Sequence, residues 1–77
     1  MKAQQTHTMF VICVNNTEYT AALELRKIYQ VIPDETAATH GLVRVIDESG
    51  KDYLYPTSYF IPVSFPPSIQ DAILRAA

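Results

Sequence analysis

The segment LVRVIDESGKDYLY, residues 42–55, decides the fold. Its first five residues are rich in β-branched side chains, and residues 53–55 (YLY) return with aromatic strand formers. Between them, the turn DESGK contains Gly50, which can adopt the positive φ that a hairpin connection needs. The segment therefore predicts two antiparallel strands joined by a hairpin.

Three further strands are predicted on either side of this hairpin. Residues 10–14 (FVICV) and 28–32 (IYQVI) are apolar, β-branched and bounded by turn formers or proline. Residues 60–63 (FIPV) predict a last strand, and Pro62 favours an edge position because proline cannot donate to a ladder. Residues 21–27 contain good helix formers, but their alternation favours an irregular loop leading into the strand at 28–32. The chain is thus mostly β.

Residues 66–77 predict a C-terminal helix. Ser68 is a candidate N-cap, and Asp71 three positions later is close to a capping box. The apolar residues fall at i, i+3, i+4 and i+7, which places them on one face: Ile69, Ala72, Ile73 and Ala76. A helix of about ten residues is marginal alone. We therefore expect its apolar face to be covered, by the chain's own sheet or by a second subunit in a homodimer.

Length and composition narrow the class of protein. With 77 residues, 48% hydrophobic and 18% charged, the chain is one small domain. A formal net charge of -2 does not suit a basic nucleic-acid module. One cysteine excludes an internal disulfide and a four-cysteine zinc site. No apolar run approaches the roughly 18 residues of a membrane span, so no membrane association is expected.

The ends of the chain and its cysteine give further expectations. Residues 1–8 are polar and are expected to form a flexible tail. The apolar run at residues 9–14 is too short for a signal peptide, and the lone Cys13 suits a reducing compartment. We therefore expect a cytoplasmic protein. Between residues 33 and 40 we expect a loop, within which residues 35–38 (ETAA) have the composition of one helical turn.

The order of elements and one short motif resemble the SH3-like small β-barrels. The motif is YPTSYF, residues 55–60, which is similar to the family's sequence of apolar residue, Pro, Ser, Asn, Tyr and Val between the fourth and fifth strands. Residues 23–27 (LELRK) resemble the Leu-x-Phe-x-x-Gly stretch before the second strand. The resemblance covers residues 10–63. It implies an all-β fold, a five-stranded SH3-like barrel over residues 9–65, followed by a short C-terminal α-helix.

The resemblance also implies a function in protein recognition. SH3 domains bind proline-rich peptides on an aromatic groove. In this chain only Pro56 and Tyr59 match the groove residues, residues 11–14 hold no tyrosine, and residues 40–42 (HGL) stand where the family has a Trp. Peptide binding in the SH3 manner is therefore not expected. Bacterial SH3-like domains also serve as adaptors, subunits and nucleic-acid binders, so the fold alone does not decide the function.

The aromatic residues near the motif predict a binding surface. Phe60 matches a core position of the family, which turns Tyr59 outward across the turn, and alternate strand residues share a face. Exposed tyrosine beside proline is typical of protein recognition surfaces. Acidic residues would border the surface and favour a basic partner. The candidate binding residues are Tyr53, Tyr55, Pro56, Tyr59, Glu18 and Glu35, with one of Tyr53 and Tyr55 expected in the core. Alternatively, Tyr59 packs on the end of the barrel and its hydroxyl bonds to a loop.

The sequence gives little support for catalysis or metal binding. No glycine-rich phosphate loop or nucleophile elbow is present, and Asp47, Glu48 and Asp52 belong to a solvated hairpin turn. The two histidines have no ligand spacing, and Cys13 is expected to be a small buried hydrophobe. Arg44 is expected to pair with Glu24 or another carboxylate on the sheet. No catalytic residue, metal or cofactor is predicted.

We therefore expect a small, non-catalytic interaction module whose partner is a protein or peptide. Two alternatives belong to other classes: a nucleic-acid-associated small barrel and a structural subunit of a homo-oligomer.

Overall fold

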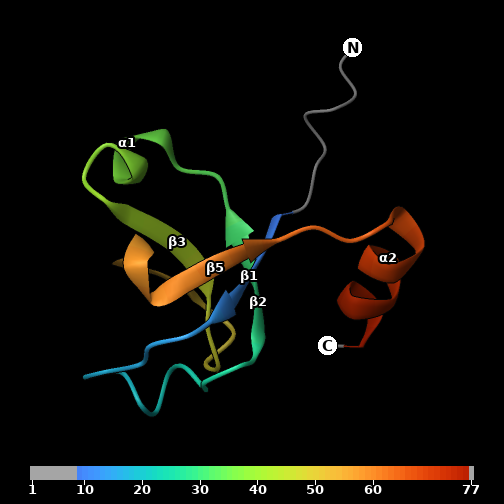
Figure 1. The fold of residues 1–77 in the computed structure, drawn as a ribbon, viewed down its shortest axis with the longest axis horizontal. Helices are drawn as coiled ribbons and strands as arrows, with labels where there is room; N and C mark the ends of the chain where they lie inside the picture. The colour runs from blue at the N-terminus through green and yellow to red at the C-terminus, as the bar shows by residue number, and fades with distance from the viewer. Residues whose placement is uncertain (1–8, 77) are drawn as a thin grey trace.

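The computed structural model describes residues 9–76 and shows a single antiparallel sheet with a short helix at each side (Figure 1). The strands lie in the order β4-β3-β2-β1-β5. The five strands are β1 (Met9–Cys13), β2 (Ile28–Ile32), β3 (Leu42–Ile46), β4 (Asp52–Pro56) and β5 (Phe60–Val63). The helical segments are α1 (Glu35–Ala38), the 3₁₀ turn η2 (Thr57–Tyr59) and α2 (Pro67–Arg75). The predicted tail at 1–8 lies outside the described residues.

All five predicted strands are confirmed. Gly50 has a φ of 84° in the β3–β4 hairpin, as its place in the turn required. Pro62 lies in the edge strand β5, opposite Val11 of β1, so its missing N–H removes no bond from a central ladder. The segment 21–27 forms irregular turns, as expected, and residues 35–38 form the single helical turn α1.

The five strands form one open antiparallel sheet that is not closed into a barrel, which differs from the predicted SH3-like barrel. β4 and β5 are its two edges, and no ladder joins them within residues 9–76. The 3₁₀ turn η2 connects β4 to β5 directly, and its backbone groups form hydrogen bonds with other segments of the chain. The N–H of Thr57 donates to the carbonyl of Gly41, and the carbonyl of Tyr59 accepts from the N–H of Val14. The chain between the edge strands is thereby bonded to neighbouring segments instead of aligning β4 with β5.

The inner face of the sheet carries the core. Strand alternation places alternate residues of each strand on this face, and loop residue Leu23 covers them. Phe60, which was predicted to lie in the core, is buried together with Val45, while Val43 is half-buried and packs against them. Cys13 is fully buried, which confirms that it behaves as a small hydrophobe. The core cluster is Val11, Cys13, Leu23, Tyr29, Val31, Val45, Tyr55 and Phe60.

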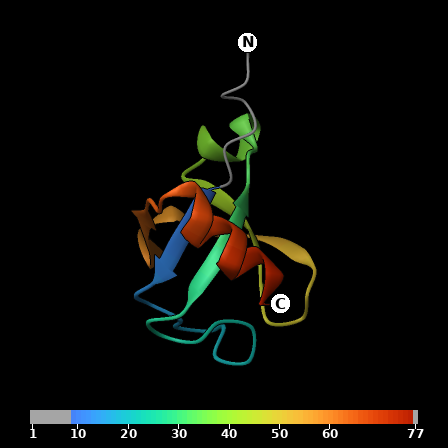
Figure 2. The same ribbon diagram turned by 90° about the vertical axis from the view of Figure 1, so that its right-hand side faces the viewer.

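The outer face is also apolar but is covered less completely. Ile12 of β1 lies opposite Ile28 of β2 and Ile61 of β5, so three isoleucines form a row across the sheet. Ile61 is 54% exposed. Phe65, in the connection after β5, packs edge-on against Phe10 with 5.7 Å between the ring centroids. The connection then carries α2 across this face, in front of β1 and β2 (Figure 2).

The helix α2 forms where the sequence predicts it, but its start and its environment differ from expectation. It begins at Pro67 with Pro66 as N-cap and no side-chain cap, so the predicted N-cap role of Ser68 is wrong. Proline suits the first helical position because its fixed φ is already helical. No residue of α2 is buried, and Ile69 is 45% exposed. In a single chain, the apolar face of α2 is therefore left largely uncovered.

Candidate binding surface

A cluster of aromatic rings joins the loop after β1 to η2. The rings of Tyr19 and Tyr55 meet edge to face with centroids 5.0 Å apart, and Tyr19 and Tyr59 do so at 6.0 Å. Tyr55 in turn contacts Phe60 at 6.2 Å. Such edge-to-face pairs are favourable because the positive ring edge meets the negative face. The cluster thus rests on the core and reaches the surface at Tyr19 and Tyr59.

The loop of residues 14–27 holds Tyr19 through its own hydrogen bonds. The N–H and hydroxyl of Thr17 both donate to Oδ1 of Asn15, at 2.9 and 2.7 Å. The side-chain amide of Asn16 donates to the carbonyl of Leu23 at 2.9 Å, which ties the loop to a fully buried anchor. Glu18 has a φ of 74°, which turns the chain immediately before Tyr19. The loop has no regular secondary structure, but these hydrogen bonds hold its conformation.

The position of Tyr59 is set by η2 and by the same loop. Its carbonyl accepts from the N–H of Val14 at 2.8 Å, and its hydroxyl donates to the carbonyl of Thr17 at 3.1 Å. The ring is half-buried, beside the half-buried Pro56. The alternative foreseen for Tyr59, a hydroxyl bonded to a loop, is therefore present in the structure. That bond orients the ring and leaves part of it exposed.

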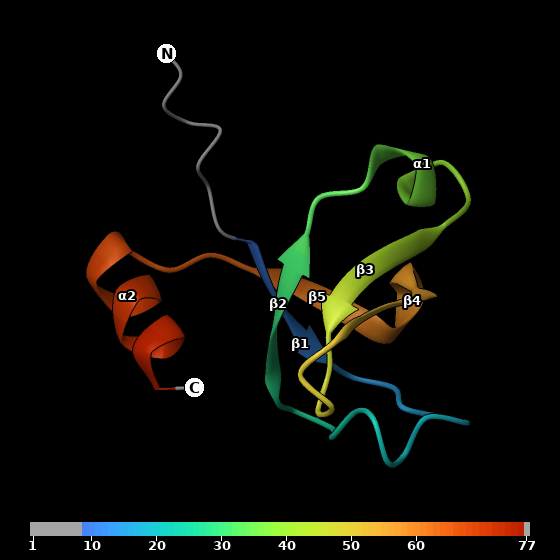
Figure 3. The same ribbon diagram turned by 180° about the vertical axis from the view of Figure 1, so that it is seen from behind.

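The remaining predicted residues lie on β4, in the 14–27 loop and on α1. Tyr55 is 3% exposed and forms the buried base, whereas Tyr53 on the same edge strand is 51% exposed. One of the two is thus inside, as expected. Glu18 and Glu35 are exposed, the first in the 14–27 loop and the second on α1. The turn η2, which follows β4 in the chain, lies between α1 and this loop (Figure 3).

Tyr19 was missed at the sequence level. The signal that marks it is an aromatic residue within the turn-forming run NNTEYT, residues 15–20, where no strand or helix needs it for packing. Only the tertiary contact with Tyr55 and Tyr59 shows that the loop folds back over the end of the sheet.

Beneath the cluster, the hydroxyl of Tyr55 donates to Oδ2 of Asp47 at 2.5 Å. Asp47 is 6% exposed, so its expected place in a solvated turn is wrong. Ser49 donates to Oδ1 of Asp47 through its N–H at 2.9 Å and its hydroxyl at 2.6 Å. Desolvation works to raise the pKa of Asp47, but the bonds from Ser49 and Tyr55 outweigh it and hold the pKa below its usual value. For Tyr55, desolvation and then the bond to Asp47 raise the pKa.

A second tyrosine on the inner face, Tyr29, is also held by a hydrogen bond from its hydroxyl to a carboxylate. The hydroxyl of Tyr29 donates to Oε2 of Glu48 at 2.5 Å and accepts from the N–H of Glu24 at 2.8 Å. Lys27 forms an ion pair with the same carboxylate at 2.6 Å. The ion pair with Lys27, followed by the bond from Tyr29, lowers the pKa of Glu48. Glu48 and Asp47 thus serve as structural partners of two buried rings.

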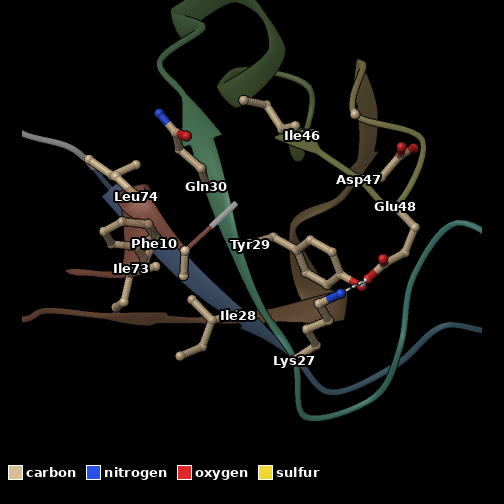
Figure 4. Close-up of a pocket in the computed structure, with 12 residues that line it drawn as sticks. Phe10, Lys27, Ile28, Tyr29, Gln30, Ile46, Asp47, Glu48, Ile73 and Leu74 are labelled. Atoms are coloured by element: carbon tan, nitrogen blue, oxygen red, sulfur yellow. Dashed lines mark hydrogen bonds and ion pairs between the residues drawn. The ribbon is translucent and has the colours of Figure 1, made fainter. Parts of the chain in front are cut away.

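A cleft of about 580 Å³ separates α2 from the sheet (Figure 4). Phe10, Ile73 and Leu74 line one end, and Lys27 and Glu48 lie at the other. Lys27 and Glu48 form an ion pair with each other, and the carboxylate of Asp47, which also lines the cleft, accepts hydrogen bonds from Ser49 and Tyr55. The cleft is therefore an apolar gap beneath α2 without an unpaired charged group at its polar end.

Two basic side chains, Arg44 of β3 and Lys27 before β2, are paired with carboxylates. Arg44 pairs with Asp34 and Asp52, each at 2.9 Å, so the expected pairing with a carboxylate is confirmed although Glu24 is not the partner. Lys27 is held by Glu48. Phosphate binding needs cations gathered and free on one surface. These three ion pairs give no support to the nucleic-acid alternative, which stays a prediction.

Residues 9–76 contain no group of three or more His, Cys, Asp or Glu placed to hold a metal ion. No helix in this part is both long and apolar enough to cross a membrane. No family model matches the chain, and no curated protein or solved structure matches it either.

Proposed function

We propose that this protein is a small, non-catalytic interaction module that binds a segment of another protein on the surface formed by Tyr19, Pro56 and Tyr59. We call this surface the tyrosine surface. The observation that carries the proposal is the pair of surface rings, Tyr19 and Tyr59, supported from below by the buried ring of Tyr55. Tyrosine offers a partner both apolar area and a hydroxyl at a small cost in rotamer entropy.

Preorganisation supports this choice over the other exposed apolar residues. Both rings are held before any partner arrives, Tyr59 by its hydroxyl bond to Thr17 and Tyr19 by the braced loop. Binding to a surface that is already ordered avoids part of the entropy cost of association. Tyr53, by contrast, is 51% exposed on an edge strand and contributes at the margin.

Charge suggests the chemistry of the partner. Glu18 stands next to Tyr19, is exposed and forms no ion pair within residues 9–76. Glu35 is exposed on α1, beyond η2. A segment with Lys or Arg beside an aromatic residue or proline would complement this arrangement, mainly through faster and more selective association.

The resemblance to SH3-like domains supports the same surface. The strand order, the irregular loop after β1 and the 3₁₀ turn between β4 and β5 agree with the element order of those domains. In that family the loops in these places contact basic residues of the ligand, and here the 14–27 loop and η2 provide the exposed ring of Tyr19 and the half-buried ring of Tyr59. Because of this agreement we also propose that the chain is related to the SH3-like domains, although its sheet is open.

Selection from a random peptide library displayed on phage tests the proposal without knowledge of the natural partner. We expect enriched peptides to carry Lys or Arg beside an aromatic residue or proline. Peptide affinity, measured by fluorescence anisotropy, should fall roughly tenfold or more for Tyr59→Ala, as at an interface hot spot. The charge reversals Glu18→Lys and Glu35→Lys should lower it by a smaller factor.

Leu54→Ala is the matched control, because Leu54 lies on the opposite face of β4 and is 40% exposed. It should leave peptide affinity unchanged. Thermal unfolding of every variant separates lost binding from lost folding. Peptides that bind Tyr59→Ala and Glu18→Lys as well as the wild type would place the binding site elsewhere. A folded domain that enriches no peptide would contradict the proposed function itself.

A further inference from the structure

β4 is an edge strand, and every second residue of it directs its backbone groups away from the sheet. At one end of the β3–β4 hairpin, the N–H of Asp47 donates to the carbonyl of Lys51. At the other end, the N–H of Thr57 donates to the carbonyl of Gly41. The register between these two ends is continuous. Because hydrogen-bonded and non-hydrogen-bonded pairs alternate in an antiparallel ladder, the even-numbered residues of β4 turn their N–H and carbonyl groups to the open edge.

The even-numbered residues of β4 are Asp52, Leu54 and Pro56. Asp52 and Leu54 each present an N–H and a carbonyl, whereas Pro56 has no N–H and is the N-cap of η2. Within residues 9–76, no strand pairs with this side of β4, and none of the loop hydrogen bonds involves the backbone of Asp52 or Leu54. Such an edge is a template for a further strand.

β5, the other edge of the sheet, offers no such template in the part of the chain that the structure describes. The carbonyl of Tyr59 accepts from the N–H of Val14, so Phe60 and Pro62 turn their backbone groups outward. The N–H of Phe60 donates to the carbonyl of Thr57, and Pro62 has no N–H. Of these two edges, only β4 can both donate to and accept from an added strand.

We propose that the partner segment bound by the tyrosine surface continues along β4 as an added antiparallel strand. This inference rests on the proposed function and specifies the conformation of the partner segment. Pro56 is the last residue of β4 and also part of the tyrosine surface, so the two sites are continuous. One residue of the segment exchanges two hydrogen bonds with Leu54, and the next residue but one exchanges two with Asp52. Extended segments bind other sheet edges in this way, with main-chain bonds that give affinity.

The side chains of β4 define the segment further. The residue between the two bonded positions lies opposite Tyr53, which is 51% exposed, in a pair whose side chains approach closely. An aromatic or β-branched residue suits this position. On the other face, Asp52 and Asp34 share the single positive charge of Arg44, so this group keeps one excess negative charge. A Lys or Arg opposite Asp52 would complement it.

Charge favours such a segment over a second copy of the chain. If β4 paired with β4 of another copy around Tyr53, the two Asp52 side chains would be diagonal neighbours on one face. Each of them belongs to a group with an excess negative charge. The whole chain also has a formal net charge of -2. Like charges oppose this pairing, whereas a basic segment is attracted.

N-methylation of a bound peptide, one residue at a time, tests the added strand. The probe is the synthetic peptide that the wild-type domain enriches most strongly from the phage library. Methylation of an N–H that donates to β4 should lower the affinity roughly tenfold, and methylation of the residue between two such donors should change it less than about twofold. Two sensitive residues should therefore flank an insensitive one. A peptide that depends on Tyr59 but lacks this pattern would overturn the added strand and leave the proposed function intact. If no peptide is enriched, both fail.

Leu54→Pro tests the same bonds from the side of the protein. It removes an N–H from the open edge and none from the β3–β4 ladder, so peptide affinity should fall roughly tenfold. Leu54→Ala keeps the N–H and is the matched control, which should bind like the wild type. Equal affinities of the two variants, both folded, would contradict the added strand.

Amide hydrogen exchange of the wild type gives an answer even if the proline variant does not fold. The N–H groups of Asp52 and Leu54 should exchange rapidly in the free protein and become protected in the peptide complex. The N–H of Tyr53, which faces β3, should be protected in both states. Unchanged exchange at Asp52 and Leu54 would overturn the inference. So would a wild type that doubles its mass in sedimentation without peptide while Leu54→Pro stays monomeric, since a second copy would then occupy the edge.

Discussion

Both faces of the sheet carry apolar side chains, but only the inner face is fully covered by other parts of the chain. On the inner face, side chains from all five strands and from the 14–27 loop pack into one cluster. On the outer face, the row Ile28, Ile12 and Ile61 is accompanied by a helix with no buried residue. The inner face therefore supplies most of the stability, and the outer face has apolar area left for association.

The polar groups of the two sides differ in the same way. Next to the core, the hydroxyls of Tyr29 and Tyr55 each meet a carboxylate, and no buried side-chain nitrogen or oxygen within residues 9–76 lacks a partner. On α2, the charges of Asp71 and Arg75 have no ion-pair partner in the described chain. Satisfied polar groups fix one packing arrangement, whereas free charges are available to a second molecule.

The largest loss of stability should come from shortening Leu23, the loop residue that covers the core. Leu23 is fully buried, so Leu23→Ala should lower the free energy of unfolding by about 2–5 kcal/mol. For a domain of this size, that loss approaches the whole stability. Ile61→Ala, on the outer edge, is the matched comparison and should cost under about 1 kcal/mol. Urea unfolding followed by circular dichroism measures both, and equal losses would contradict the contrast between the two faces.

The next effect concerns the hydroxyl beneath the tyrosine surface. Tyr55→Phe removes a donor from the buried carboxylate of Asp47, so the free energy of unfolding should fall by about 1–3 kcal/mol. Tyr59→Phe removes a hydroxyl bond that is exposed and should cost at most about 0.5 kcal/mol. Thermal unfolding of the two variants side by side tests this order. A Tyr59→Phe variant that is the less stable of the two would reverse our reading of which hydroxyl is structural.

Acid should weaken the interactions that the carboxylates of Asp47 and Glu48 make with Tyr55 and Tyr29. The pKa values of Asp47 and Glu48 are lowered in the folded state, so both groups release protons more readily there than in the unfolded chain. Their contribution to stability is complete above their ordinary pKa values and is lost as the pH falls through the lowered ones. Urea midpoints should therefore be level from neutral pH to about pH 5 and decline below about pH 4. In Glu48→Gln the decline should be shallower, and an unchanged decline would exclude Glu48 as a contributor.

Local patterns were sufficient to predict the strands, and long-range contacts were not visible in them. The hairpin follows from Gly50 between two strand-forming runs, and the edge position of β5 follows from Pro62, because each rests on backbone chemistry within a few residues. The open sheet could not be predicted, since it depends on hydrogen bonds from η2 to Gly41 and Val14, distant in sequence.

The candidate site shows the same division. Pro56 and Tyr59 were found through a short motif, and Glu18 and Glu35 through the places of their loops. Tyr19 was missed because its contact with Tyr59 joins residues 40 positions apart. Asp47 was misjudged because a carboxylate in a turn is normally solvated, whereas here Ser49 and the hydroxyl of Tyr55, from the returning strand, both donate to the buried carboxylate.

The smallest effect on stability should come from removing α2 altogether. Deleting residues 67–77 leaves Phe65 in place, and its ring packs edge-on against Phe10, which is only 2% exposed. Because no residue of α2 is buried, the truncated chain should lose less than about 1 kcal/mol of unfolding free energy at a concentration where the protein is monomeric. Phe65→Ala in the full chain is the matched variant and should cost more, since it removes the ring that packs against Phe10. If the truncation destabilises the protein more than Phe65→Ala does, α2 closes onto the sheet in solution and the outer face is sealed like the inner one. The mass of the truncated chain, measured at high concentration, then shows whether the helix was also needed for association.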